Sequence, residues 1–238
     1  MPAVAPPYSS PSPCVRVVGS FAELVSTPFY GAVNALCWPR TLAGDYDEIA
    51  AVVGPLDEIT TIEKDDLLSL RLSPAGKIAR AQLISDLRLL RDASLEPSLD
   101  LIPAYPREPE PGPVPIDVYD WHADSANTLA DTFLCSYTVA ASEGVANEDV
   151  VRRIDIPETR AELLKLHGGP DDSSFANWCR ERCYDLHYEA LPGARPFSFG
   201  FGNMWRIATQ CPGSPVPPSI HRAPSTRAGQ APRLLLIS

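Results

Sequence analysis

Proline is the residue that most restricts where this chain can form regular secondary structure. The 238 residues include 26 prolines, concentrated in residues 1–13, 103–115 and 211–218. Because proline has no backbone N–H and interrupts helix interiors and sheet ladders, we expect these segments to be linkers and loops. The middle segment separates an N-terminal part with helical patterns from a C-terminal part with the patterns of strands.

The N-terminal part carries helix signals. Ser20 is followed three residues later by Glu23, which is the capping-box pattern of a helix start. From Pro74 to about Ala93, apolar residues recur three and four positions apart, as they do in a helix that lays one face on a core. We therefore expect residues 14–102 to form a helical support region.

The C-terminal part is predicted to be rich in strands. The segments 116–122 ("IDVYDWH") and 131–140 ("DTFLCSYTVA") have the β-branched and aromatic content of strands. Two helices are expected after Pro157 before strands return toward the C-terminus. Short strands separated by glycine and proline turns predict a sandwich or jelly roll, and together with the N-terminal helices they predict an α+β fold.

Charge and composition narrow the range of partners. The formal net charge is −10 and the largest basic cluster is "VRR" at 151–153, so most of the surface would repel a phosphate backbone. Nucleic acid is therefore not expected as a partner. No stretch approaches the roughly 18 uninterrupted apolar residues of a membrane span, so no membrane partner is expected either. The sequence gives no indication of an oligomeric state.

The chain is expected to be one cytoplasmic domain, residues 14–238, behind a disordered leader at residues 1–13. The leader has neither the basic n-region nor the apolar h-region of a secretory signal. Without such a signal, the six cysteines are expected to be reduced thiols. The length fits one large domain about as well as two small ones, and we favour one.

Three polar residues form a candidate metal site. "DWHADSANT" at 120–128 places His122 and Asp124 two residues apart, and His221 follows 97 residues after Asp124. Residues at i and i+2 leave one face of a strand end, and a distant strand of a small barrel can supply a third ligand. Two imidazoles and one carboxylate are the facial triad of non-haem Fe(II) oxygenases. The alternative is a polar pair at a strand end, with Asp124 starting a turn.

A candidate carboxylate clamp lies near the C-terminus. Arg233 follows His221 by twelve residues, at the head of the last strand-like segment, "RLLLIS". An antiparallel neighbour of the His221 strand could carry this guanidinium into the same cavity. Its fixed fork of donors suits the far carboxylate of a dicarboxylate cosubstrate. Arg222 and Arg227 remain alternatives for the same role.

The order of these motifs carries a resemblance to a known family. "WHAD", then "SIHRAP", then "RLLLIS" resembles the Fe(II)/2-oxoglutarate-dependent oxygenases, whose core is a double-stranded β-helix. Residues 117–238 also resemble a group of small oxygenase-like proteins with the pattern H-x-D … L-C-x-Y … H-R-x-P … R-L-L-L. The resemblance implies a jelly-roll, cupin-like core over residues 117–238, braced by the N-terminal helices. The N-terminal half has no motif that matches the family.

The resemblance also implies ligands and an activity. It implies that three residues bind Fe(II): His122, Asp124 and His221. Arg233 would bind the C5 carboxylate of the cosubstrate 2-oxoglutarate, and Tyr137 and Thr132 would hydrogen-bond the same molecule. With O2, such enzymes couple oxidative decarboxylation of 2-oxoglutarate to oxidation of a C–H bond. Because Asp124 is retained, halogenation is disfavoured, and hydroxylation, desaturation or oxidative cyclisation is expected.

The expected substrate is a small molecule, either an amino acid or a secondary-metabolite intermediate. Fungal members that oxidise valine, including one that forms an aziridine, are similar in kind. Arg206, next to aromatic residues, is the candidate contact for a substrate carboxylate, and His187 is an alternative metal ligand. Two alternative functions remain open: a cupin-type metal dioxygenase that does not use 2-oxoglutarate, and a non-catalytic jelly-roll binding protein.

Overall fold

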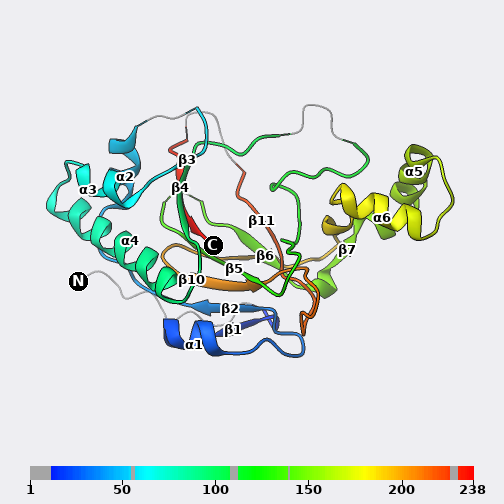
Figure 1. Cartoon of the computed structure of the whole chain (residues 1–238), viewed down its shortest axis with the longest axis horizontal. Coiled ribbons are helices and arrows are strands. Elements are labelled where there is room, and N and C mark those ends of the chain that lie inside the picture. The colour runs from blue at the N-terminus through cyan, green and yellow to red at the C-terminus, as the bar shows by residue number, and fades with distance from the viewer. Residues whose placement is uncertain (1–11, 55–56, 108–111, 139, 226–229) are drawn as a thin grey trace.

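The computed structural model describes residues 12–54, 57–107, 112–138, 140–225 and 230–238, and within these the chain has a mixed α+β fold (Figure 1). The strands are β1 Val15–Val17, β2 Ala35–Trp38, β3 Thr60–Thr61, β4 Ser98–Ile102, β5 Asp131–Ser136, β6 Glu143–Val145, β7 Val150–Arg152, β8 Tyr188–Ala190, β9 Phe197–Ser198, β10 Met204–Ala208, β11 Ile220–Arg222 and β12 Arg233–Ile237. The helices are α1 Phe21–Ser26, α2 Tyr46–Val53, α3 Lys64–Ser69, α4 Pro74–Asp92, α5 Pro157–His167 and α6 Ser173–Glu181, with short 3-10 turns at Asn147–Asp149, Arg153–Asp155 and Tyr184–Leu186.

The strands form one large sheet and two small ones. The large sheet has the order β1-β2-β10-β5-β12-β4-β3, and its pairs are antiparallel except for β1 with β2. The small sheets have the orders β11-β6-β9 and β7-β8. The described residues do not close into a barrel. The chain nevertheless crosses repeatedly between sheets, since β5, β10 and β12 lie in the large sheet whereas β6 and β11 lie in the small one.

The two faces of the large sheet are both buried, against different partners. On one face, Phe133 and Cys135 of β5 pack in a core formed with helices α1 to α4. On the other face, Leu134 packs with Trp205 and Phe199, and the rings of Phe199 and Trp205 stack at 4.3 Å. Because side chains alternate along a strand, odd and even residues of β5 face opposite layers. The second face, toward the small sheet, is the one that holds the candidate site.

The predicted helices are confirmed, but the N-terminal part contains more than helices. Ser20 caps α1 by accepting from the backbone N–H of Glu23, and Ser73 caps α4 in the same way. Residues 14–102 also supply β1 to β4 to the large sheet, which the sequence analysis did not predict. These strands are short and some are buried on both faces, so they lack the alternation that identifies a strand in sequence.

The predicted strand at 116–122 was wrong. Most of this segment forms bends and turns, and only His122 makes isolated β-bridges. The carboxylate of Asp117 accepts a hydrogen bond of 2.9 Å from the backbone N–H of Tyr119, which is a local turn contact. Aspartate side chains that bond their own backbone in this way compete with strand pairing, and here the turn prevails.

Helices α5 and α6 form a pair at the end of the molecule opposite α4 (Figure 1). Pro157 opens α5 and Gly168 ends it in the left-handed conformation, as the sequence predicts. Helix α6 begins at Ser173 as predicted, but it ends at Glu181 and not at residue 186, and a 3-10 turn at Tyr184–Leu186 follows it. Within the described part of the chain, no helix has the length and apolar character needed to cross a membrane.

Candidate metal centre

The structure brings His122, Asp124 and His221 together. One nitrogen or oxygen atom from each lies within 4.8 Å of the other two. Oδ1 of Asp124 is 4.0 Å from Nε2 of His122 and 3.7 Å from Nε2 of His221. Segments almost a hundred residues apart meet here because His122 pairs with His221 through two backbone hydrogen bonds of 2.9 Å.

His122 and Asp124 each have two polar side-chain atoms, and in each residue one of them already makes a hydrogen bond. The other atom, Nε2 of His122 or Oδ1 of Asp124, faces the site. Nδ1 of His122 lies 2.8 Å from the carbonyl oxygen of Asp120, so it carries the hydrogen and Nε2 presents its lone pair. Oδ2 of Asp124 accepts a 2.6 Å hydrogen bond from the hydroxyl of Thr132, which leaves Oδ1 free. His221 is held less tightly, with Nδ1 3.5 Å from the Ser219 oxygen.

The protonation states also suit a metal. Burial and the neighbouring His221 lower the pKa of His122 to about 4, so this imidazole is neutral at pH 7. Burial would raise the pKa of Asp124, but His221 and the Thr132 hydrogen bond outweigh it and lower that pKa below its ordinary value. A neutral imidazole and an ionised carboxylate are the forms that bind metal ions.

Two of the three donor separations are short enough for one bound ion. Metal bonds to nitrogen and oxygen are about 2.1 Å long, so two donors that share an ion are at most about 4.2 Å apart. The separations of Asp124 Oδ1 from the two imidazoles, 3.7 and 4.0 Å, fall within this limit. Two imidazoles and one carboxylate are a donor set for Fe(II) with positions left open.

Arg233 enters the same cavity. A cavity of about 120 Å³ is lined by all three metal-ligand candidates together with Arg233 and Thr132. A single water requires about 10–15 Å³, so a small organic molecule fits. The remaining lining is mostly apolar: Val118, Leu134, Ala223, Leu235 and Ile237.

The guanidinium of Arg233 is buried without an anionic partner among the described residues. Only 4% of the residue is exposed, and its Nε has no hydrogen-bond partner. Its remaining nitrogens donate to three hydroxyls, at 3.2 Å to Tyr105, 2.8 Å to Ser136 and 2.7 Å to Ser142. Burial lowers the pKa of Arg233, because no carboxylate offsets the loss of water.

These three hydroxyls were not predicted from the sequence as partners of Arg233. Ser136 lies four residues after Thr132 on β5, and the even spacing places both side chains on the same face of the strand. That rule was sufficient to find Ser136. Tyr105 and Ser142 come from irregular segments of the chain, where no periodicity indicates the direction of a side chain.

The structure does not bring Tyr137 to the cavity. It lies five residues after Thr132, an odd spacing, so it faces the helices instead. Its hydroxyl donates a 2.6 Å hydrogen bond to Asp86 of α4, and its ring stacks on Tyr46 at 5.2 Å. Asp86 is fully buried and also accepts from Arg40 at 2.7 Å. Tyr137 therefore anchors α4 to the sheet.

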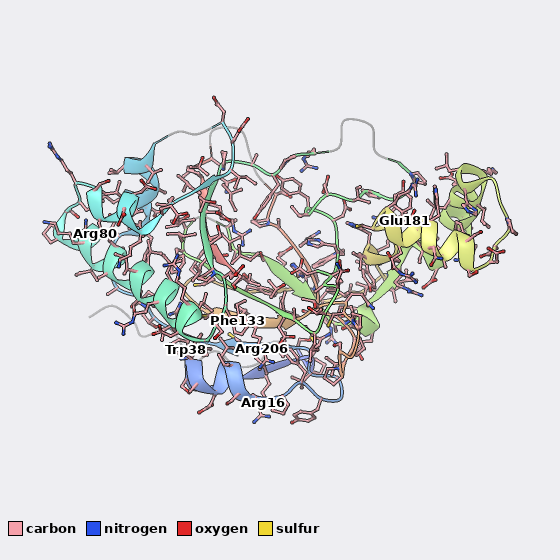
Figure 2. The ribbon with its side chains drawn as sticks, viewed as in Figure 1. Arg16, Trp38, Arg80, Phe133, Glu181 and Arg206 are labelled. Atoms are coloured by element: carbon pink, nitrogen blue, oxygen red, sulfur yellow. The ribbon has the colours of Figure 1, made fainter. Side chains whose placement is uncertain are left out.

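Arg206 also lies outside the cavity. Its Nε donates to Asp131 at 2.7 Å, and its NH1 donates to the carbonyl oxygens of Leu24, Val25 and Thr27. Figure 2 shows Arg206 at the side of the sheet where α1 lies. Side chains alternate along β10, and Trp205 and Ile207 point to the face of the sheet that bears the cavity. Arg206, between them, therefore points to the opposite face. Arg206 caps the C-terminal end of α1.

The alternative clamp and ligands have separate positions. Arg222 does not line the cavity; it pairs with Glu143 at 2.7 Å and lies over the ring of Trp121. Arg227 lies outside the described residues. His167 packs against the rings of Phe175 and Trp178.

His187 lies beside His122 but is not one of the three clustered donors. Burial and Arg153 lower the pKa of His187 to about 4, so this imidazole is neutral at pH 7.

Comparisons with known proteins add one loose structural likeness. No model of a known protein family matches the chain, and no curated protein matches it. Among solved structures, the non-heme iron oxygenase OrfP is similar over 91% of this chain and 77% of that chain, at 12% identity and a TM-score of 0.34. Because the overlap is so loose, the functional interpretation rests on the geometry of the site.

A second, larger cavity is lined by a different set of residues. It measures about 440 Å³ and is lined by residues 125–127, by Arg180 of α6 and Asp185 after that helix, and by residues 210–212 after β10. None of the three metal-ligand candidates lines it. The smaller cavity is therefore the one that contains the three candidate metal donors.

Proposed function

We propose that this protein is an Fe(II)/2-oxoglutarate-dependent oxygenase that oxidises a C–H bond of a small molecule. His122, Asp124 and His221 would hold the iron, and Arg233 would bind the C5 carboxylate of 2-oxoglutarate. The observation that carries the proposal is the buried guanidinium of Arg233, which shares a cavity with three convergent metal donors and has no anionic partner among the described residues.

A buried charge without a counter-ion is unfavourable by several kcal/mol, because water no longer solvates it. Three neutral hydroxyls orient the Arg233 guanidinium but do not neutralise it. A carboxylate that enters the cavity would supply the missing charge. A dicarboxylate would do so while its other end reaches the metal, which accounts for both features of the cavity at once.

The path of the chain supports a double-stranded β-helix. After β4 in the large sheet, His122 pairs with the small sheet, β5 returns to the large sheet and β6 to the small one. Farther along the chain, β10, β11 and β12 alternate in the same way. Alternation between two facing sheets is the strand path of a jelly roll. In this arrangement the ligands lie on the inner face of one sheet and Arg233 on that of the other.

Iron with 2-oxoglutarate and O2 would supply an oxidant for C–H bonds. The residues of this chain would position the participants: Thr132 fixes the carboxylate of Asp124, and Arg233 orients the cosubstrate. The apolar walls formed by Val118, Leu134 and Ala223 would exclude water from the reacting atoms. An amino acid or a secondary-metabolite intermediate is the favoured substrate, with hydroxylation, desaturation or cyclisation as the outcome.

Two alternatives make different predictions for Arg233. In a cupin-type dioxygenase that does not use 2-oxoglutarate, Arg233 would be structural and the metal would still bind. In a non-catalytic binding protein, neither the metal nor 2-oxoglutarate would be needed. Because no described carboxylate pairs with Arg233, the proposed cosubstrate is favoured over both alternatives.

Anaerobic addition of Fe(II) and 2-oxoglutarate tests the proposal, since chelated 2-oxoglutarate gives a weak visible charge-transfer band. We expect the band in the wild-type protein, and in Arg233→Gln only at a much higher 2-oxoglutarate concentration. Arg222→Gln is the matched control and should behave as the wild type. A wild-type protein that binds iron but gives no band would favour the cupin-type alternative.

A further inference from the structure

Three histidines form a row across neighbouring strand segments. His122 makes antiparallel bridges to His221 on one side and to His187 on the other. Residues directly opposite one another in antiparallel segments point to the same face of a sheet. The ring centroid of His122 lies 4.5 Å from that of His221 and 6.0 Å from that of His187. His187 therefore extends the row beyond the metal donors on the face where they lie.

His187 is buried and lacks a hydrogen-bond partner. Only 5% of the residue is exposed, and its Nδ1 is inaccessible and unpaired among the described residues. No described residue hydrogen-bonds its Nε2 either. A neutral imidazole has one donor and one acceptor, and buried polar groups normally find partners. The imidazole of His187 thus has hydrogen-bonding capacity that no described residue uses.

The position of His187 relative to Arg233 indicates what that partner is. Arg233 donates to Ser142, which immediately precedes β6, and β6 pairs with β11 on the side of His221 away from His122. His187 pairs with His122 on the opposite side. If the cosubstrate extends from Arg233 to the metal, the flank next to His187 is left for the second reactant.

We propose that His187 hydrogen-bonds the molecule that occupies the open side of the metal away from Arg233, and so selects a substrate with a polar group beside the reacting carbon. This inference rests on the proposed metal site. His187 would be a positioning residue and not a ligand, because its ring atoms lie outside the cluster of three donors.

The backbone at His187 does not depend on its side chain. Its carbonyl accepts from Arg153 N–H at 2.9 Å, and the next residue, Tyr188, donates to Trp121 at 2.8 Å. These contacts join backbone atoms and do not involve the imidazole. A substitution at His187 is therefore expected to remove the hydrogen bond and leave the neighbouring His122 in place.

Azide binding to the Co(II)-loaded protein tests the inference without knowledge of the substrate. Azide occupies open metal positions and accepts hydrogen bonds, and Co(II) reports its binding by visible absorption. We expect His187→Leu to bind Co(II) normally and to bind azide roughly five- to tenfold more weakly, the loss of about one hydrogen bond. His187→Gln should restore part of the affinity and is the second variant if His187→Leu does not fold. The control is His167→Leu. His167 is a half-buried histidine at the end of α5, and it packs against the ring of Phe175 in α6.

The outcomes separate the two proposals. Equal azide affinity in the wild type and both His187 variants would overturn this inference and leave the metal site intact. Loss of Co(II) from His187→Leu would show that His187 is a ligand, which also overturns the inference. A wild-type protein that binds no Co(II) would overturn the proposed metal site and this inference with it.

Discussion

The hydroxyl of Thr132 donates a 2.6 Å hydrogen bond to Oδ2 of Asp124, and it is Oδ1 of the same carboxylate that faces the two imidazoles. This contact fixes the rotation of the carboxylate before any metal arrives. Hydrogen bonds to metal ligands of this kind usually change metal affinity by about 10- to 100-fold. Thr132 therefore acts on the metal through Asp124.

Thr132→Val is expected to weaken Fe(II) binding by about tenfold or more, because the Asp124 carboxylate becomes free to rotate. The measurement is a competition titration against a metal indicator. Thr61→Val is the matched control, since Thr61 on the edge strand β3 donates a 2.7 Å hydrogen bond to Asp100 of β4 and neither residue lines the cavity. Unchanged metal affinity in Thr132→Val would contradict the role assigned to this contact.

Arg233→Met is expected to leave the ligand-free protein nearly as stable as the wild type, within about 2 kcal/mol. Removal of an unpaired buried charge offsets the loss of three hydrogen bonds to hydroxyls. In the presence of metal, 2-oxoglutarate at a hundredfold excess over its Kd should stabilise the wild type by about 2.7 kcal/mol and the variant much less. Denaturant unfolding with and without 2-oxoglutarate measures both effects, and equal stabilisation of the two proteins would exclude Arg233 as the clamp.

Arg206→Met should show the opposite behaviour. It removes the partner of Asp131 and the donors to three carbonyl oxygens at the end of α1, which we expect to lower the free energy of unfolding by about 2–3 kcal/mol. Iron and 2-oxoglutarate binding should be unchanged, because Arg206 lies on the other face of the sheet. If the variant is stable but binds 2-oxoglutarate or substrate more weakly, Arg206 acts in ligand binding, which contradicts the structural role assigned to it.

Tyr137→Phe is expected to destabilise the protein by about 1–2 kcal/mol without affecting the metal. The variant removes one hydrogen bond to the buried carboxylate of Asp86, which keeps its contact with Arg40. Thermal unfolding and metal titration on the same sample separate the two effects. A tenfold loss of metal or 2-oxoglutarate affinity would show that Tyr137 acts at the cavity after all.

The sequence was sufficient to predict that His122, Asp124 and His221 lie together as candidate metal donors, because of their residue types and their order. It was less informative about the residues around them. Thr132 was assigned to the cosubstrate, but the structure places it against Asp124, a contact between side chains that no spacing reveals. Tyr137 and Arg206 were chosen for chemistry alone, and strand parity relative to Thr132 and Trp205 would have excluded both.

Other features depend on tertiary structure that the sequence pattern does not express. The segment 116–122 has the composition of a strand but is held in turns by Asp117. Tyr105 reaches Arg233 from a segment 128 residues away. The row of histidines exists only because His122 pairs with two distant segments at once. These contacts come from chain topology, whereas the helix starts at Ser20, Ser73 and Pro157 depend on local sequence and were predicted correctly.

The central claim is that His122, Asp124 and His221 bind one iron. Its most direct test is the iron-to-protein ratio after anaerobic loading with Fe(II) and removal of excess metal. We predict one iron per chain in the wild type and in His187→Ala, and only a small fraction of that in His221→Ala. Stoichiometric iron in a folded His221→Ala, or none in the wild type, would contradict the account.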